Sequence, residues 1–210
     1  MQHSRDAKVT IPPLNGLVLA GGRSKRMGRD KGLLDWHGKA QRYYLADLLT
    51  AYCKQVYISC RADQVNDITT AGYLALPDSA IPDAQFGAIV SAMAAEPANA
   101  WLVVACDLPF IDNVAFDYIV HQRDAYKLAT AYLSPENGLP EPLCAIWEPQ
   151  AKAMLLEQYA KGIDCPRKAL LHNAGQAKFV DSPKKEYLMN VNTPEAAAEA
   201  RQLITGYVSR

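Results

Sequence analysis

The residues of this chain that could do chemistry gather in one glycine-rich, basic stretch. Gly21, Gly22 and Gly28 fall within eight residues, and without a Cβ they let the backbone come close to a ligand. Five cations lie in the nine residues that end this stretch, namely Arg23, Lys25, Arg26, Arg29 and Lys31. Backbone N–H groups of such a turn can point at phosphate oxygens, and cationic side chains neutralise the remaining charge. The stretch predicts a site for a polyanion, although it contains neither GxxxxGK[ST] nor GxGxxG.

A second candidate group is Asp107, which directly follows the apolar run Trp101–Cys106. A carboxylate at the end of a fully apolar strand is costly unless it holds a cation, and Mg²⁺ prefers carboxylates and phosphate oxygens. We therefore expect Asp107 to bind the metal, with a turn cap or an ion pair to Arg26 as the alternatives. With Arg26 and Lys31 on the triphosphate, such a site suits attack on the α-phosphorus of a nucleotide, with pyrophosphate leaving.

Alternating strands and helices must position these groups. The apolar patterning predicts strands at 14–19, 56–58, 73–76, 101–106, 127–133, 143–147 and 188–191. It predicts helices at 41–52, 62–71, 87–95, 149–159 and 167–172, a helix capped by Asp112, a closing helix capped by Thr193, and a loop from Ser79 to Gln85. Strand–helix alternation indicates a mostly parallel sheet covered by helices on both faces. We expect a flexible lead-in over residues 1–13 and a single domain over 14–210.

Composition narrows the class of partner. The 210 residues contain 22 Lys+Arg and 22 Asp+Glu, so neither a nucleic acid nor an anionic membrane surface is indicated. Five scattered cysteines without CxxC spacing argue against a disulfide framework or a zinc site. The four histidines are treated as surface or packing residues. With no signal-like or membrane-spanning run, the expected location is the cytoplasm.

The pattern LAGGxSxRMGxDK, filled from Leu19 to Lys31, resembles the nucleotidyltransferase loop of the MobA-type molybdenum cofactor guanylyltransferases. The resemblance implies a three-layer α/β/α Rossmann-like nucleotidyltransferase fold, mostly parallel with one antiparallel strand late in the sheet. It also implies Mg²⁺-dependent transfer of GMP from GTP to the phosphate of the molybdenum pterin cofactor. The nucleotide-binding residues would be Leu19, Ala20, Gly21, Gly22, Arg23, Ser24, Arg26, Met27, Gly28, Lys31, Ser59, Asp78 and Asp107, with Arg26, Lys31 and Asp107 as the catalytic set. For Asp78 the alternative is an Asx turn after Pro77.

The acceptor side of the resemblance lies near the end of the chain. The family motif NxNTPE corresponds to Asn190–Glu195, and residues two apart on a strand share a face, so Asn190 and Asn192 could both reach the acceptor. Turn and cap chemistry is the alternative for Asn192. Arg167 and Lys168 could hold an acceptor phosphate, or could simply form a solvated face.

Base specificity stays open at this stage. Ser59 stands where the family often has asparagine, and the segment from Ala84 to Ile89 replaces the common Gly-Pro-Leu-Gly-Gly-Ile, whereas Gly21 favours a purine. The alternatives are a cytidylyl- or sugar-phosphate nucleotidyltransferase, or a non-catalytic nucleotide-binding module. The protein is expected as a monomer or small homo-oligomer, possible partners being proteins that insert the cofactor.

Overall fold

The computed structural model describes residues 11–22, 30–78 and 84–208, and its centre is a seven-stranded sheet. The strand order is β3-β2-β1-β4-β6-β5-β7. The strands are β1 (Leu14–Leu19), β2 (Val56–Cys60), β3 (Leu74–Pro77), β4 (Ala100–Ala105), β5 (Ala129–Leu133), β6 (Pro140–Trp147) and β7 (Lys178–Asp181). β6 runs antiparallel to both of its neighbours, β4 and β5, while the other pairings are parallel. The prediction of a mostly parallel sheet with one late antiparallel strand is confirmed.

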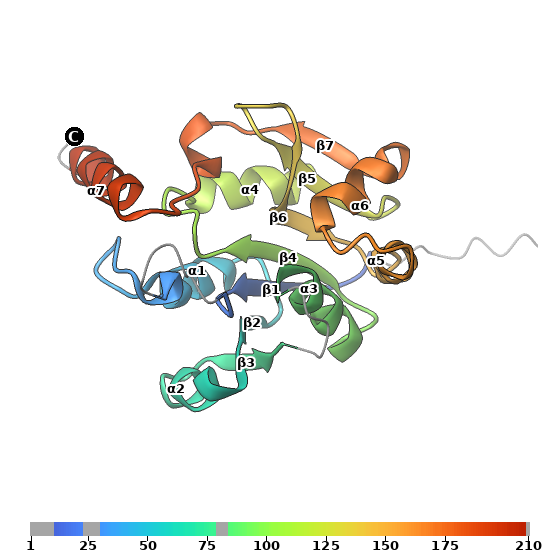
Figure 1. Cartoon of the computed structure of the whole chain (residues 1–210), viewed down its shortest axis with the longest axis horizontal. Coiled ribbons are helices and arrows are strands. Elements are labelled where there is room, and N and C mark those ends of the chain that lie inside the picture. The colour runs from blue at the N-terminus through green and yellow to red at the C-terminus, as the bar shows by residue number, and fades with distance from the viewer. Residues whose placement is uncertain (1–10, 23–29, 79–83, 209–210) are drawn as a thin grey trace, which may run out of the picture.

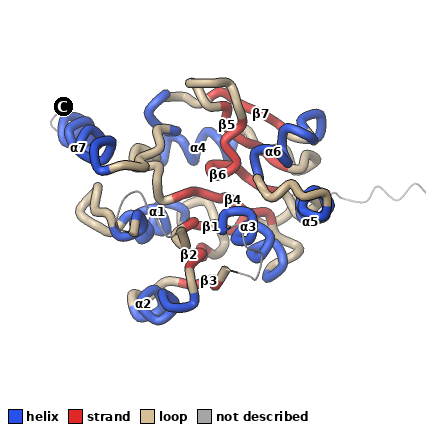
Figure 2. The backbone as a smooth tube through the Cα atoms, viewed as in Figure 1, coloured by secondary structure: helices blue, strands red, loops and turns tan. Residues whose placement is uncertain are grey.

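Helices cover both faces of this sheet, which gives the predicted three layers (Figures 1 and 2). The α-helices are α1 (Gln41–Leu49), α2 (Val65–Thr70), α3 (Ala84–Ala95), α4 (Asn113–His121), α5 (Ala151–Ala160), α6 (Pro166–His172) and α7 (Pro194–Val208). Side chains of α1 and α4 pack into one core cluster, and side chains of α3, α5 and α6 pack into another. The two clusters are the two sides of the sheet, because neighbouring residues of β4 alternate between them: Leu102 and Val104 in one, Trp101 and Val103 in the other.

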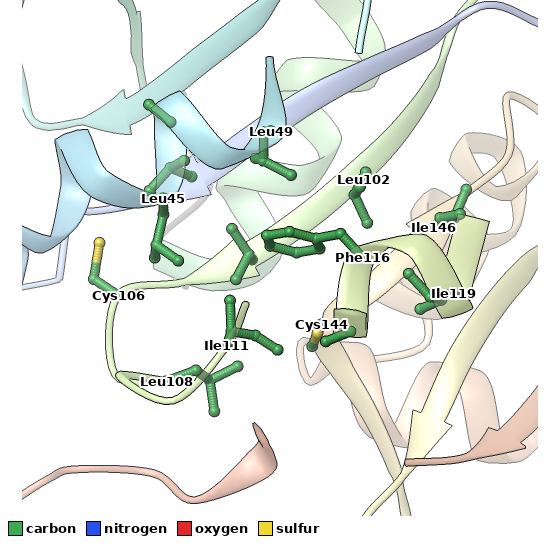
Figure 3. Close-up of a cluster of buried hydrophobic side chains, with 14 of the residues drawn as sticks. Leu45, Leu49, Leu102, Cys106, Leu108, Ile111, Phe116, Ile119, Cys144 and Ile146 are labelled. Carbon is green, nitrogen blue, oxygen red and sulfur yellow. The ribbon is translucent and has the colours of Figure 1, made fainter. Parts of the chain in front are cut away.

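The central strand β4 is apolar along its whole length because it is buried in the core. All six residues of β4 are buried, as expected for a strand that is covered on both faces. Figure 3 shows one side of it, where Leu102 of β4 faces Phe116 of α4 and Leu49 of α1 lies close by. Asp112 caps α4 as predicted, because its carboxylate accepts from the Ala115 N–H at 3.1 Å.

Two predictions about elements were wrong. The stretch 188–191 is not a strand: a 3₁₀ turn spans Lys185–Leu188, and the sheet ends instead with β7, which pairs with β5. The apolar residues of that stretch, Leu188 and Val191, are buried, but in loop packing, and the Val191 N–H donates to the Asp107 carbonyl at 2.8 Å. The predicted loop 79–85 is also too long, because α3 already begins at Ala84; residues 79–83 lie outside the described part.

Helix α7 lies at the margin of the molecule, on the side toward which β1 points (Figure 1). Thr193 caps it as predicted, since its hydroxyl accepts from the Ala196 N–H at 3.2 Å. Ala197 and Ala200 form its buried face against Trp36 and Val191, in a small cluster apart from the two main cores. In the described ranges no helix has both the length and the apolar character needed to span a membrane.

Candidate functional site

The carboxyl ends of the parallel strands β1, β2 and β4 meet at one edge of the sheet and open into a cleft. Ligands of open α/β sheets bind at this kind of edge. The described lining residues are Leu19, Ala20, Gly21, Gly22, Asp30, Lys31, Gly32, Ser59, Gln85, Ala88, Ala105, Cys106 and Asp107. The structure therefore brings together seven of the residues that the sequence singled out for the nucleotide.

Lys31 and Asp107 form the charged centre of this cleft. The Lys31 ammonium lies 3.4 Å from Asp107 Oδ2, and both side chains are largely buried, with 19% and 16% of their surface exposed. The same ammonium donates a hydrogen bond to Asn192 Oδ1. Arg26, the alternative partner of Asp107, lies outside the described residues, as do Arg23, Ser24, Met27 and Gly28.

The position of Lys31 is set by Asp30, a residue that the sequence analysis passed over. Asp30 precedes the short 3₁₀ turn Lys31–Leu33, and its Oδ1 accepts from the Gly32 N–H at 2.9 Å. Its other oxygen accepts from Gln64 at 2.6 Å, which ties the turn to the segment after β2. The sequence Asp-Lys-Gly offered a signal, since an aspartate just before a turn commonly accepts from a backbone N–H two residues on.

A second carboxylate, Asp78, lies beside the glycine-rich turn. Its Oδ1 accepts a hydrogen bond from the Ser59 hydroxyl, and its N–H donates to the Cys60 carbonyl at 2.9 Å. A Cβ added to Gly21 would stand 2.2 Å from Asp78 Oδ2, so the carboxylate fills the space that any other residue at 21 would need. Burial raises the pKa of Asp78, and the Ser59 hydroxyl and the Arg61 charge oppose that rise.

The second oxygen of Asp107 is suited to a cation. Oδ1 is buried and has no hydrogen-bond partner among the described residues. A buried anionic oxygen without a donor is costly, and a hard divalent ion would satisfy it. Across the described residues there is no group of three or more His, Cys, Asp or Glu side chains placed to hold a metal. Of the described residues, Asp107 would hold a metal here, together with oxygens of a ligand or of water.

The predicted acceptor residues lie in different surroundings. Asn192 accepts a hydrogen bond from Lys31, whereas Asn190 is exposed, and neither residue lies in a strand. Arg167 is half-buried and bound to Glu141, with NH2 of its guanidinium 2.8 Å from Glu141 Oε2. Lys168 is exposed. Glu141 itself is a buried carboxylate.

Comparison with known proteins identifies the family. Residues 16–176 match the family model of the MobA-like NTP transferase domain. The chain belongs to the MobA-like NTP transferase family. It is 31% identical to the molybdenum cofactor guanylyltransferase of Pseudomonas putida, over 88% of this chain and 96% of that protein. It is 32% identical to the molybdenum cofactor biosynthesis bifunctional protein of Synechocystis sp., over 90% of this chain and 54% of that protein. The chain thus spans about half the length of this second relative.

A solved structure agrees in fold. The molybdopterin-guanine dinucleotide biosynthesis protein A of Archaeoglobus fulgidus superposes with a TM-score of 0.70 at 20% identity, over 91% of this chain and 99% of that chain. The MobA-like family and this architecture together make the protein a nucleotidyltransferase enzyme. The predictions of family, fold and enzyme class are confirmed, whereas the roles of individual residues stay predictions.

Proposed function

We propose that this protein transfers GMP from GTP to the phosphate of the molybdenum pterin cofactor and releases pyrophosphate. The observation that supports this most is the Lys31–Asp107 pair beside Gly21 and Gly22. It combines a cation for phosphate, a carboxylate whose buried Oδ1 has no partner among the described residues, and backbone without side chains at the strand edge where nucleotides bind. The relatives named molybdenum cofactor guanylyltransferase support the choice of substrates.

The reaction requires little acid–base chemistry from the protein. An oxygen of the acceptor phosphate bonds to the α-phosphorus of GTP, and the bond from that phosphorus to the bridging oxygen breaks, so that pyrophosphate leaves with the electron pair. The second pKa of a phosphate monoester is about 6, so the attacking oxygen is already ionised near neutral pH. The protein therefore contributes mainly orientation and cations, with Lys31 neutralising charge on the triphosphate.

Asp107 would hold Mg²⁺ together with triphosphate oxygens. When bound there, Mg²⁺ neutralises the negative charge that gathers on those oxygens. Asn192 keeps the Lys31 ammonium next to Asp107 by accepting one of its hydrogen bonds. The buried Asp107 Oδ1 supports Mg²⁺ as the ion held at this site.

Guanine is the base that the Asp78 side of the cleft would accept best. Guanine presents two adjacent donors, N1–H and the 2-amino group, and a carboxylate can accept both. Asp78 lies next to Gly21, and Ser59 orients its carboxylate. Cytosine and uracil have no such pair of donors. Many family members have an asparagine at the position of Ser59, near the base. Here the Asp78 carboxylate, held by the Ser59 hydroxyl, would recognise guanine in its place.

The test is a panel of GTP, CTP, UTP and ATP with Mg²⁺ and the molybdenum pterin phosphate, with pyrophosphate release as the readout. GTP should give the highest kcat/KM. Preference for CTP or UTP would assign the protein to a cytidylyl- or sugar-phosphate branch, and tight GTP binding without turnover would make it a binding module. We also propose that the reaction takes place in the cytoplasm, in a monomer or small homo-oligomer that hands its product to cofactor-inserting proteins.

A further inference from the structure

The short 3₁₀ turn that follows β2, Ala62–Gln64, contacts two parts of the cleft wall at once. β1 and β2 are neighbouring parallel strands, so the segments that follow them lie at the same edge of the sheet. Arg61, which precedes the turn, donates from Nη1 to the Gly21 carbonyl at 3.4 Å. Gln64, which ends it, donates from Nε2 to Asp30 Oδ2 at 2.6 Å. Gly21 and Asp30 both line the cleft, whereas the turn stands behind them.

The side chain of Gln64 is held in one orientation. It is buried, with 5% of its surface exposed. The Gln64 N–H donates to the Arg61 carbonyl at 3.0 Å, and Gln64 Oε1 accepts from the Arg61 N–H at 3.0 Å. A backbone N–H can only donate and a carboxylate can only accept, so the amide must turn its oxygen to Arg61 and its NH2 group to Asp30. Gln64 is thus a fixed donor aimed at Asp30.

Asp30 carries this contact to the charged centre of the cleft. One carboxylate oxygen accepts from Gln64, and the other accepts from the Gly32 N–H at 2.9 Å. The second bond closes the 3₁₀ turn that begins at Lys31, whose ammonium lies 3.4 Å from Asp107 Oδ2. Hydrogen bonds to an ionised carboxylate are roughly twice as strong as those between neutral groups. Loss of the Gln64 donor should therefore loosen the turn that carries Lys31.

The contact of Arg61 with Gly21 is the weaker of the two. Asp63 holds the Arg61 guanidinium through Nε at 3.1 Å and Nη2 at 3.2 Å. This ion pair is largely exposed, and the 3.4 Å bond from Nη1 to Gly21 is long for a hydrogen bond. The buried amide of Gln64 should therefore contribute more to the geometry of the cleft than Arg61 does.

We infer that Gln64 is a positioning residue, which holds Asp30 and thereby keeps the Lys31 ammonium beside Asp107. The inference rests on the proposed nucleotidyl transfer, in which that ammonium neutralises charge on the triphosphate. Charge on the leaving pyrophosphate is greatest in the transition state, so a misplaced ammonium lowers kcat more than it weakens GTP binding. Gln64 thus acts on the reaction through the Lys31 turn.

The first experiment compares Gln64→Ala with the wild-type chain in pyrophosphate release and in GTP binding. kcat should fall roughly tenfold, the effect of one hydrogen bond to a charged group, while Kd for GTP stays within about threefold of the wild-type value. Gln158→Ala is the matched control, because the Gln158 amide is also buried and its Oε1 contacts His172 Nδ1 at 3.2 Å. It should leave kcat unchanged. Wild-type kcat in a folded Gln64→Ala enzyme, or equal losses in the two variants, would overturn the inference.

The second experiment uses Gln64→Glu and the pH profile of kcat/KM. When protonated, the introduced carboxyl can donate to Asp30 as the amide does; when ionised, it repels Asp30. Relative to wild type, kcat/KM of the variant should therefore be highest at low pH and fall as pH rises. The other charged groups near this position are Lys31, Arg61 and Asp63, with Arg42 of α1 across Gly32 from Asp30. These groups are the same in both proteins. A constant ratio between the two profiles is the result of a purely structural role and would contradict the inference.

The third experiment reads the position of Lys31 without turnover. The nucleotide-free protein is treated with an amine-reactive label, and the rate at Lys31 is followed by mass spectrometry. Lys31 is 19% exposed and should react slowly in the wild type and in Gln158→Ala, but several times faster in Gln64→Ala. An unchanged rate in Gln64→Ala would contradict a positioning role. Failure of the proposed function is distinguishable, since it would show as absent GTP turnover in the wild type, whereas the labelling rate is independent of turnover.

Discussion

The ammonium of Lys31 lies 3.4 Å from a carboxylate oxygen of Asp107, although the two residues are 76 positions apart in the chain. Asp107 follows a strand that is buried on both faces, and Lys31 opens a short 3₁₀ turn in which the Gly32 N–H donates to the Asp30 carboxylate. The pair is therefore placed by rigid structure on both sides. A cation and an anion held in this way form a polar centre at the edge where β1 and β4 end.

Replacing Lys31 by Gln should reduce kcat/KM for nucleotidyl transfer from GTP by about a hundredfold, which corresponds to about 2.7 kcal/mol of transition-state stabilisation. The amide can still hydrogen-bond Asn192, but it cannot neutralise charge on the leaving pyrophosphate. Steady-state pyrophosphate release measures the loss, with a substitution of Lys161, an exposed lysine that directly follows α5, as the control (Lys161→Gln). A Lys31→Gln enzyme with wild-type kcat/KM would show that Lys31 only packs against Asp107.

Replacing Gly21 by Ala should weaken GTP binding by roughly tenfold, about 1.4 kcal/mol. The added methyl would meet Asp78 Oδ2 at 2.2 Å, so the carboxylate must leave its position beside Ser59. Titration calorimetry with GTP and Mg²⁺ measures the change. Gly175→Ala is the matched control, because a Cβ there meets no heavy atom within 4 Å. Equal affinity for GTP in the Gly21 variant and in the control would show that Asp78 does not contact the nucleotide base.

Asp78 should also give the stability of the unliganded protein a pH dependence of known sign. Burial raises its pKa above the usual 3.8, so between that value and the raised one the folded state binds more protons than the unfolded state. The stability that Asp78 contributes is present in full below pH 3.8 and is lost as pH rises through the raised pKa. Urea unfolding of wild type and Asp78→Asn from pH 3.5 to 7 measures it. The wild type should lose stability relative to the variant as pH rises, and a gain would contradict the burial of this carboxyl.

The pair of Arg123 and Glu148 should be essential for folding stability. The Glu148 side chain is fully buried and accepts from Arg123 at 2.7 and 2.9 Å, and Arg123 also donates to the Pro12 carbonyl at 2.9 Å. Arg123→Met would leave an uncompensated buried charge and should cost about 3–5 kcal/mol in the free energy of unfolding. Denaturant titration measures this, with the exposed Lys161→Met as a control that should not change stability measurably. A loss no larger than that of the control would contradict a stabilising role for this pair.

The sequence was sufficient for most of the architecture because the strongest signals are local. The apolar run before Asp107 predicted β4, and the caps at Asp112 and Thr193 predicted the starts of α4 and α7. The error at 188–191 has a physical cause. The apolar side chains of Leu188 and Val191 correctly indicated that these residues are buried. Whether buried residues also pair with a neighbouring strand depends on the arrangement of the whole sheet, and here β7 occupies its edge.

The candidate site could likewise be predicted only in part. Glycines, cations and strand-end carboxylates are recognisable by type, and the structure places Gly21, Gly22, Lys31 and Asp107 around one cleft. Pairings across the fold are not recognisable in this way, because Glu141–Arg167 and Ser59–Asp78 each depend on how two separate elements pack. Arg167 could be noticed as a charge near a proline, but its partner could not.

The measurement that tests the central claim most directly is Mg²⁺-dependent pyrophosphate release by Asp107→Asn, with GTP and the molybdenum pterin phosphate as substrates. The amide keeps the size of the side chain but removes the anionic oxygens that face Lys31 and the proposed metal. The account predicts a loss of at least about a thousandfold in kcat, with thermal stability close to that of the wild type. Wild-type turnover in a folded Asp107→Asn enzyme would contradict it.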